Sequence, residues 1–357
     1  MINKDSPRYV PLLKGKQGEL DALVDTSITT QATTIPLIEV VPGSGQSDDP
    51  LEIRADCSKL IERLGKRWSG RVMLDGGLLD QDVALDAADH GVVYFLAEEA
   101  RRWTMTAQPV LRLGDPHRVF LDVATVCAED GNGLTIRLTN DELDEEPEVL
   151  DTELESAVSL IGLAYEDVDL LIDLSEVQGE PAVAGAARIV LPLLRGLTSI
   201  DRWRSVTVAS GSFPIDLSTF TAWVVGERPR DDAKLYDRVT TRWHGRRLDY
   251  GDYAVAHPVL GTGAPYAPPP QLRYTASSSW IVLKGRRTDP RANNQFYDIC
   301  DVVAAHPEYA GAGLGVADAR IANSRAEGPG NGTTWRRIGT AHHLDYVALR
   351  LTTLGEP

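Results

Sequence analysis

Cysteine is scarce in this sequence. The 357 residues contain three cysteines, Cys57, Cys127 and Cys300, which lie far apart and form no Cys-x-x-Cys pair. This number and spacing exclude a disulfide framework and a cysteine-based zinc module. They also indicate a reducing compartment, so we expect a cytoplasmic protein.

The sequence also lacks long apolar runs. No stretch approaches the roughly 18 apolar residues of a transmembrane helix. Residues 1–7 lack the apolar core of a secretory signal peptide. We therefore expect no membrane association.

Basic residues are in the minority. There are 36 lysines and arginines against 52 aspartates and glutamates, which gives a formal net charge of −16. Binding along a nucleic acid requires a basic stripe that displaces counterions, so bulk nucleic-acid binding is not expected and a nuclease is a weak hypothesis. Hydrophobic content of 43% and charged content of 25% are typical of a globular chain, which excludes disorder as the main state.

What the sequence does have is a repeated unit, a short apolar run closed by a polar residue. The clearest example is residues 168–174, where Asp173 closes the run. Such runs are typical of parallel strands covered by helices. Eight of them occur, each followed by a helical stretch such as 83–103: 9–13, 35–38, 72–74, 109–111, 134–136, 168–174, 206–209 and 253–256. The pattern predicts an α/β protein with a closed (β/α)8 barrel of the TIM type. An open doubly wound sheet is the alternative.

The composition changes after the eighth run. Residues 259–278 are rich in glycine and proline and are predicted to form a linker between a barrel at 1–258 and a C-terminal extension at 279–357. We expect the extension to be α+β, with a strand at 279–284, a helix at 294–305 and a strand at 342–351. It should pack on the barrel as part of the same structural unit.

The active site of a (β/α)8 barrel lies at the carboxyl ends of its strands. Every predicted strand ends in a functional group, in chain order Lys14, Glu39, Asp75, Arg112, Arg137, Asp173, Ser210 and His257. The three cations would bind a phosphate or carboxylate, and Ser210 would assist them. The three carboxylates would act as acid and base or hold Mg²⁺, and His257 would titrate near neutral pH.

We therefore predict a catalytic set and a ligand-binding set at this mouth. Asp173, Glu39, Asp75 and His257 are the catalytic candidates. A structural alternative remains for each neighbouring pair, because strand ends of opposite sign, such as Asp75 and Arg112, also form ion pairs that only fix the rim.

The extension adds four ligand-binding candidates, which we expect to close over the mouth: Lys284, Trp335, Arg336 and His342. The loop at 330–332 is rich in glycine and would offer backbone amides to an anion, although an ordinary turn is the commoner role of such a loop. If 342–351 is a strand, His342 and His343 point to opposite faces.

Two blocks carry a resemblance to a known family. The first joins residues 9–19 to 35–39, and the second holds 280–285, Gln295, 328–331, Trp335-Arg336 and 339–344. In these blocks the chain resembles the Beta protein family. The resemblance implies a phage or mobile-element setting, with anti-phage defence as an expectation, and it implies that the tail belongs to the family's core unit. It carries over no catalytic role.

Two functions follow as hypotheses. The first is an enzyme, such as a phosphoester hydrolase, that acts on a phosphorylated or otherwise anionic small molecule or nucleotide. The alternative is a non-catalytic sensor or a protein-interaction subunit of a phage-defence system, whose acidic surface would meet a protein partner.

Overall fold

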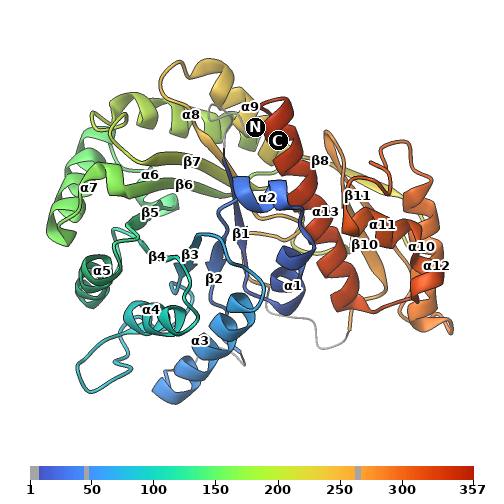
Figure 1. The fold of residues 1–357 in the computed structure, drawn as a ribbon. Helices are drawn as coiled ribbons and strands as arrows, with labels where there is room; N and C mark the ends of the chain where they lie inside the picture. The colour runs from blue at the N-terminus through green and yellow to red at the C-terminus, as the bar shows by residue number, and fades with distance from the viewer. Residues whose placement is uncertain (1–7, 44–47, 262–266) are drawn as a thin grey trace.

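Eight parallel strands close into a barrel. The computed structural model describes residues 8–43, 48–261 and 267–357, without the side chains of residues 140 and 141, so residues 1–7 and the middle of the loop before residue 50 lie outside the described residues. The strand order is β1-β2-β3-β4-β5-β6-β7-β9, and β1 closes the ring by pairing with β9, Tyr9 opposite Tyr250 (Figure 1). The strands are β1 (Tyr9–Leu13), β2 (Leu37–Glu39), β3 (Val72–Asp75), β4 (Ala107–Leu111), β5 (Leu134–Leu138), β6 (Val168–Glu176), β7 (Ser205–Gly211) and β9 (Asp249–Asp252). The closed barrel is confirmed.

Helices surround the barrel. They are α1 (Gln17–Asp25), α2 (Ile28–Thr33), α3 (Pro50–Gly65), α4 (Val92–Arg102), α5 (His117–Asp130), α6 (Asn140–Leu143), α7 (Pro147–Ile161), α8 (Glu180–Gly196) and α9 (Asp231–Arg242). In α3, Pro50 occupies the first turn, and the Asp49 carboxylate accepts a hydrogen bond from the Leu51 N–H. Its buried residues Ile53, Cys57, Leu60, Ile61 and Leu64 follow the helical period.

The helix expected at 83–103 begins only at Val92. The Asp86 carboxylate accepts hydrogen bonds from the N–H groups of Ala88 and His90, which favours a local turn over a helix. The longer helix was therefore a wrong prediction in its first half.

The eighth strand lies four residues earlier than predicted. It is β9, at 249–252, and the apolar run 253–256 belongs to the loop that follows it. Asp249, Gly251 and Asp252 make this strand look like a turn in the sequence. Gly251 is required by the narrow barrel interior, because a Cβ there would lie 2.7 Å from the Ala209 Cβ and 3.1 Å from the Val10 carbonyl oxygen.

The extension contains a three-stranded antiparallel sheet in the order β10-β11-β8. Its strands are β10 (Gln271–Thr275), β11 (Ser279–Lys284) and β8 (Gly226–Pro229), and β8 comes from the segment between β7 and α9. Strand β10 lies inside the range 259–278, so the linker prediction is corrected there, while residues 262–266 of that range lie outside the described residues. Helices α10 (Gln295–Ala304), α11 (Val316–Ala322) and α12 (Ser324–Glu327) complete the extension.

The last helix, α13 (Gly332–Thr353), replaces the strand predicted at 342–351. Asn331 caps it by accepting hydrogen bonds from the N–H groups of Thr333 and Thr334. Its sequence is apolar on more than one face because it packs on two sides. Near its start, Trp335, Ile338 and Ala341 join the apolar core of the extension. Near its end, Leu344, Val347, Ala348 and Leu351 join the apolar layer outside the barrel.

Helix α13 occupies the place of the helix that follows the eighth strand. It packs against α1, α2 and β1, between the barrel and the extension (Figure 1). The segment between β9 and α13 is therefore an enlarged loop at the carboxyl end of the barrel, and β8, from the loop after β7, joins it. How the chain divides into domains stays a prediction.

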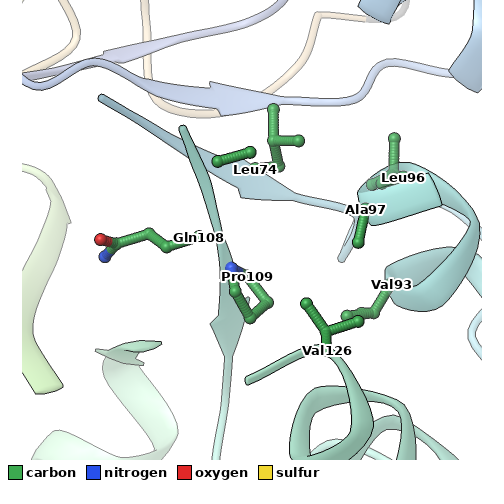
Figure 2. A pocket seen from close by; sticks show the side chains of 8 residues that line it. Leu74, Val93, Leu96, Ala97, Gln108, Pro109 and Val126 are labelled. Carbon is green, nitrogen blue, oxygen red and sulfur yellow. The ribbon is translucent and has the colours of Figure 1, made fainter. Parts of the chain in front are cut away.

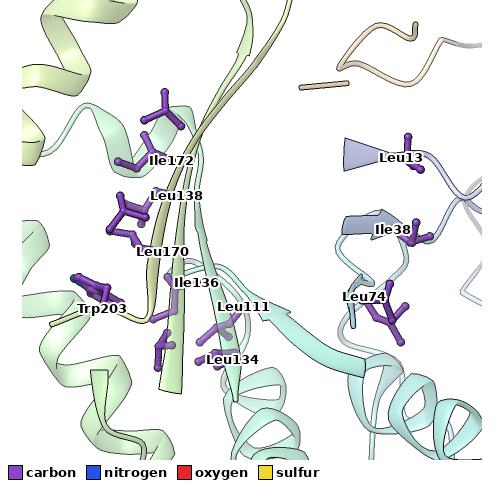
Figure 3. Packing of buried hydrophobic residues seen from close by; sticks show 14 of the residues in the cluster. Leu13, Ile38, Leu74, Leu111, Leu134, Ile136, Leu138, Leu170, Ile172 and Trp203 are labelled. Carbon is purple, nitrogen blue, oxygen red and sulfur yellow. The ribbon is translucent and has the colours of Figure 1, made fainter. Parts of the chain in front are cut away.

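The barrel interior is layered. Alternation along each strand points apolar side chains such as Leu13, Ile38, Leu74 and Leu111 outward to the helices (Figure 3). The middle of the interior is apolar and is filled by Val10, Leu12, Leu37, Met73, Val110, Leu171 and Ala209. The amino-end layer is polar, with Gln108, Thr135 and Ser205 around the buried Asp169, which Arg71 and Arg204 approach to 2.9 Å.

Candidate functional site at the barrel mouth

Arg137 is the centre of a charged layer at the carboxyl ends of the strands. It comes from β5 and is 4% exposed. Its Nη1 donates hydrogen bonds to Glu39 Oε1 at 2.9 Å and Asp75 Oδ2 at 2.5 Å. Its Nε and Nη2 donate to Asp173 Oδ2 at 3.0 Å and 2.6 Å. One guanidinium thus joins carboxylates from β2, β3 and β6. These carboxylates point inward because each lies two residues after an interior residue, namely Leu37, Met73 and Leu171.

Two further cations complete this layer. Lys14 Nζ lies 2.6 Å from Glu39 Oε2 and also donates to the Pro258 carbonyl. Arg112 donates from Nη1 and Nη2 to the two oxygens of Asp75, at 3.0 Å and 2.7 Å. We call Lys14, Glu39, Asp75, Arg112, Arg137 and Asp173 the mouth network. Its three cations balance its three carboxylates.

Tyr253 belongs to the same layer and was missed by sequence reasoning. Its hydroxyl donates to Asp173 Oδ2 at 2.6 Å and accepts a hydrogen bond from Arg137 Nη2 at 2.9 Å. It directly follows β9, as Lys14 and Arg112 directly follow β1 and β4, but the misplaced eighth strand hid this signal. Burial and the Asp173 charge raise the pKa of Tyr253 well above its usual value, so its phenol stays neutral.

Mutual pairing keeps this network charged. Burial alone would raise the pKa of Asp75, but Arg112 and Arg137 outweigh it and lower that pKa below its usual value. Burial alone would lower the pKa of Arg137, but Tyr253 and the three carboxylates raise it. The carboxylates therefore serve first as partners of guanidinium groups, as the structural alternative expected for Asp75 and Arg112.

One carboxyl group beside the network differs. Asp115 Oδ2 accepts a hydrogen bond from the Arg112 backbone N–H at 2.8 Å, and no lysine or arginine of the described residues lies within 4.0 Å of its carboxylate. Burial raises its pKa, and the neighbouring Asp75 and Glu142 add to the effect. Asp115 thus holds a proton more readily than an ordinary aspartate, a feature that no sequence pattern pointed to.

Ser210 and His257 lie outside the mouth network. Alternation along β7 places Ser210 on the outer face with Val206 and Val208. His257 lies five residues past the end of β9 rather than directly after the strand. Its Nε2 is 3.3 Å from Glu176 Oε2, and its Nδ1 accepts a hydrogen bond from the Val259 N–H, so both ring nitrogens are engaged.

Three of the four candidates from the extension bond within the extension or to the loop after β7, and not to the mouth network. Lys284 Nζ donates to the Leu217 carbonyl at 2.6 Å, and Trp335 Nε1 donates to the Pro329 carbonyl at 2.7 Å. His342 is fully buried between Asp318 and the Thr275 carbonyl. The fourth, Arg336, reaches the barrel, where it donates to the Val255 carbonyl at 3.0 Å.

A second buried polar cluster joins α13 to the outside of the barrel. His343 Nε2 lies 2.8 Å from Asp252 Oδ2, and the Tyr9 hydroxyl donates to Asp252 Oδ1 at 2.7 Å. Burial alone would raise the pKa of Asp252, but the charge of His343 and its hydrogen bond lower it to about 2. Because α13 packs on two sides, the consecutive residues His342 and His343 are both buried, each with its own partner.

Two hollows of the described structure lie away from the mouth network. One, of about 10 Å³, sits between β4 and helices α4 and α5, lined by Leu74, Val93, Leu96, Pro109 and Val126, and has room for one water at most (Figure 2). Another, of about 240 Å³, lies at the amino end of β9, lined by Tyr236, Trp243, Arg246, Leu248 and Gly355 among others.

Metal and membrane features are absent from the described part of the chain. It contains no group of three histidine, cysteine, aspartate or glutamate side chains arranged to hold a metal ion. Around Arg137 the reason is plain, since Glu39, Asp75 and Asp173 converge on its guanidinium. No helix in the described ranges is long and apolar enough to cross a bilayer.

Comparisons with known proteins found distant structural neighbours and one family. A mutant tryptophan synthase alpha-subunit from Pyrococcus furiosus is similar at 15% identity and a TM-score of 0.39, over 71% of this chain and 89% of that one. A type I 3-dehydroquinate dehydratase from Clostridium difficile is similar at 12% identity and a TM-score of 0.37, over 72% and 88%. A search of curated proteins found no match. The family model described as Beta protein matches residues 9–349, nearly the whole chain, and the protein therefore belongs to the Beta protein family.

Proposed function

We propose that the protein binds a small anionic molecule at the carboxyl end of its barrel, with Arg112 and Arg137 supplying the positive charge. The observation that carries this proposal is the gathering of three cations and three carboxylates from six strands in one connected layer. Sites of (β/α)8 barrels lie at this face.

The energetics support a role beyond packing. Moving an ion out of water costs several kcal/mol, and a buried ion pair is often no more stable than apolar side chains of the same volume. The middle layer of this barrel shows that its interior accepts apolar side chains. A charged layer at the mouth is therefore not required to fill the barrel.

Arg112 has a more solvent-exposed side chain than its partners Asp75 and Arg137 in the mouth network. Its side chain is 19% exposed, whereas that of Asp75 is 1% exposed and that of Arg137 is 4% exposed. Asp75 accepts hydrogen bonds from Nη1 and Nη2 of Arg112, but a guanidinium carries five N–H donors, so other donors of Arg112 remain. We assign the outward donors of Arg112 to the ligand. Arg137 would act indirectly, because its hydrogen bond to Asp75 holds the carboxylate that positions Arg112.

The test is thermal stability against a panel of anions. Inorganic phosphate, nucleotides, sugar phosphates and dicarboxylates are added to the wild type, Arg112→Met and Arg71→Met. Arg71 is the matched control, because it pairs with Asp169 at the opposite end of the barrel and its side chain is 23% exposed. A ligand at one hundred times its Kd stabilises by about 2.7 kcal/mol.

We expect one class of anion to stabilise the wild type and Arg71→Met but not Arg112→Met. If every anion affects all three proteins alike, the proposal fails. The non-catalytic protein-partner role in a phage-defence setting then becomes the better account, and pull-downs with purified candidate partners would follow.

Phosphoester hydrolysis is a second candidate, and Asp115 favours it. A carboxyl group with a raised pKa beside an arginine suits general acid catalysis of a leaving group. Asp173, Glu39 and Asp75 are already hydrogen-bonded to cations, so their role in such an enzyme would be to position Arg137 and Arg112. Asp115→Asn should then abolish turnover of a hydrolysable ligand while it leaves the affinity unchanged; equal turnover would remove this candidate.

A further inference from the structure

Two arginines, one from the enlarged loop and one from α13, converge on one backbone oxygen. Arg273, from β10, donates from Nη1 to the Val255 carbonyl at 2.6 Å. Arg336, from the first turns of α13, donates from Nη1 to the same carbonyl at 3.0 Å. Val255 follows β9 by three residues. The two guanidinium groups are therefore brought together beside the carboxyl end of the eighth barrel strand.

Their charge is poorly compensated. No carboxylate of the described residues lies within 4.0 Å of either guanidinium. Glu19 is the carboxylate whose charge acts on both, but its Oε2 accepts a hydrogen bond from the Lys14 N–H. Burial, followed by the charge of Arg336, lowers the pKa of Arg273 well below its usual value. Burial likewise lowers the pKa of Arg336. An anion between the two would relieve this repulsion.

Most of their donors are unused. Two guanidinium groups carry ten N–H bonds, yet each forms one hydrogen bond to the described residues, and both bonds end on one oxygen. Their remaining nitrogens are not among the fully buried, unsatisfied side-chain atoms of the described residues, so these nitrogens keep some accessible surface although both side chains are largely buried. Arg246 shows the contrast, because its single guanidinium donates to the carbonyls of Ile200, Trp203 and Arg204.

The surroundings hold the pair in place. The Arg273 guanidinium lies 4.4 Å from the centre of the Phe213 ring, in the loop after β7. Arg336 packs on the start of α1, where a Cβ on Gly18 would lie 3.0 Å from the Arg336 Cγ. Helix α1 has no side-chain cap at this end, so its first N–H groups also favour negative charge here.

We propose that Arg273 and Arg336 form a second binding site, for the phosphate group of a small molecule, between the loops that follow β7 and β9. Two planar guanidinium forks with free donors match the tetrahedral oxygens of phosphate. Loops after the seventh and eighth strands form phosphate sites in many barrels of this type. The site shares no residue with the mouth network, so the two sites are tested separately.

The experiment is titration calorimetry with inorganic phosphate at constant ionic strength, with chloride as the balancing anion. The proteins are the full-length wild type, Arg273→Met, Arg336→Met, Arg246→Met and Arg112→Met. Arg246→Met is the matched control, because it also removes a guanidinium that donates to backbone carbonyls. Arg112→Met removes the accessible cation of the mouth network.

We expect Arg273→Met and Arg336→Met each to weaken phosphate binding at this site by about 10- to 100-fold, as expected for loss of hydrogen bonds to a charged group. Arg246→Met and Arg112→Met should keep this site's affinity. If the wild type binds no phosphate under these conditions, or if both arginine variants bind as the wild type does, the proposal is wrong.

Arg273→Lys and Arg336→Lys guard against variants that fail to fold. Lysine keeps the charge and the apolar stem but lacks the fork. Circular dichroism establishes that each variant is folded. Phosphate binding weakened by about tenfold in the lysine variants supports the site, and unchanged binding overturns it.

Discussion

Replacing Arg137 with methionine tests the mouth network as a buried electrostatic unit. Methionine keeps much of the length of the side chain but removes the charge and all donors. Glu39 would keep Lys14 at 2.6 Å, and Asp75 would keep the fork of Arg112. Asp173 would keep hydrogen bonds from the Tyr253 hydroxyl and the Ser175 N–H, but no cation. The change therefore leaves one buried carboxylate without a counter-charge.

The magnitude follows from that geometry. Removing one partner of a buried ion pair costs about 3–5 kcal/mol in unfolding free energy, and we expect this loss for Arg137→Met at pH 7. Arg71→Met should cost about 1 kcal/mol or less, because Arg71 is partly exposed and Asp169 keeps Arg204 at 2.9 Å. The double variant Arg137→Met/Asp173→Asn should be more stable than Arg137→Met, since it removes the uncompensated charge.

The assay is urea denaturation of the four proteins at pH 7 and pH 5, followed by circular dichroism. Burial without a cation favours the protonated form of a carboxyl group, so the deficit of Arg137→Met should shrink as the pH falls. The account of the network is refuted if this deficit is the same at both pH values and the double variant is no more stable than the single one.

Three further predictions concern other parts of the structure. Gly77→Ala should abolish the anion response as Arg112→Met does, because a Cβ at Gly77 would overlap Arg112 Nη1; a normal thermal shift in Gly77→Ala with the same anion would contradict this. His343→Gln should reduce the loss of stability in acid: the pKa of Asp252 is lowered to about 2, so its ionisation stabilises the fold above about pH 4 and that contribution is lost between about pH 4 and pH 2. Melting temperatures across this range measure it, and a wild-type profile in the variant would disprove the role of the pair. A chain ending at residue 331 should not melt cooperatively, because α13 supplies Leu344, Val347 and Leu351 to the layer outside the barrel; a cooperative melt would show that the barrel folds without it.

Much of the barrel was predictable from sequence, because its strands are apolar runs of fixed form. The positions at their ends were also predictable, and Lys14, Glu39, Asp75, Arg112, Arg137 and Asp173 do meet in one layer. Their pairing was not, because it depends on how Arg137 reaches across the barrel to three other strands.

The errors have physical causes. Strand β9 carries Asp249, Gly251 and Asp252, which are residue types common in turns. The segment is a strand because it pairs with β1 and β7, which the local sequence does not report. Helix α13 is buried on two sides, so its apolar pattern loses the helical period. Strand β8 pairs with β11 from about fifty residues away, a contact that no local pattern reports.

The most direct test of an anion site at the barrel mouth is a crystal structure with tungstate, a tetrahedral anion that scatters strongly. The account predicts an anomalous peak from tungsten beside Arg112, with the tungstate oxygens about 3 Å from the guanidinium nitrogens of Arg112. Tungstate bound at the amino end of the barrel, beside Arg246, with none at Arg112 would contradict the account.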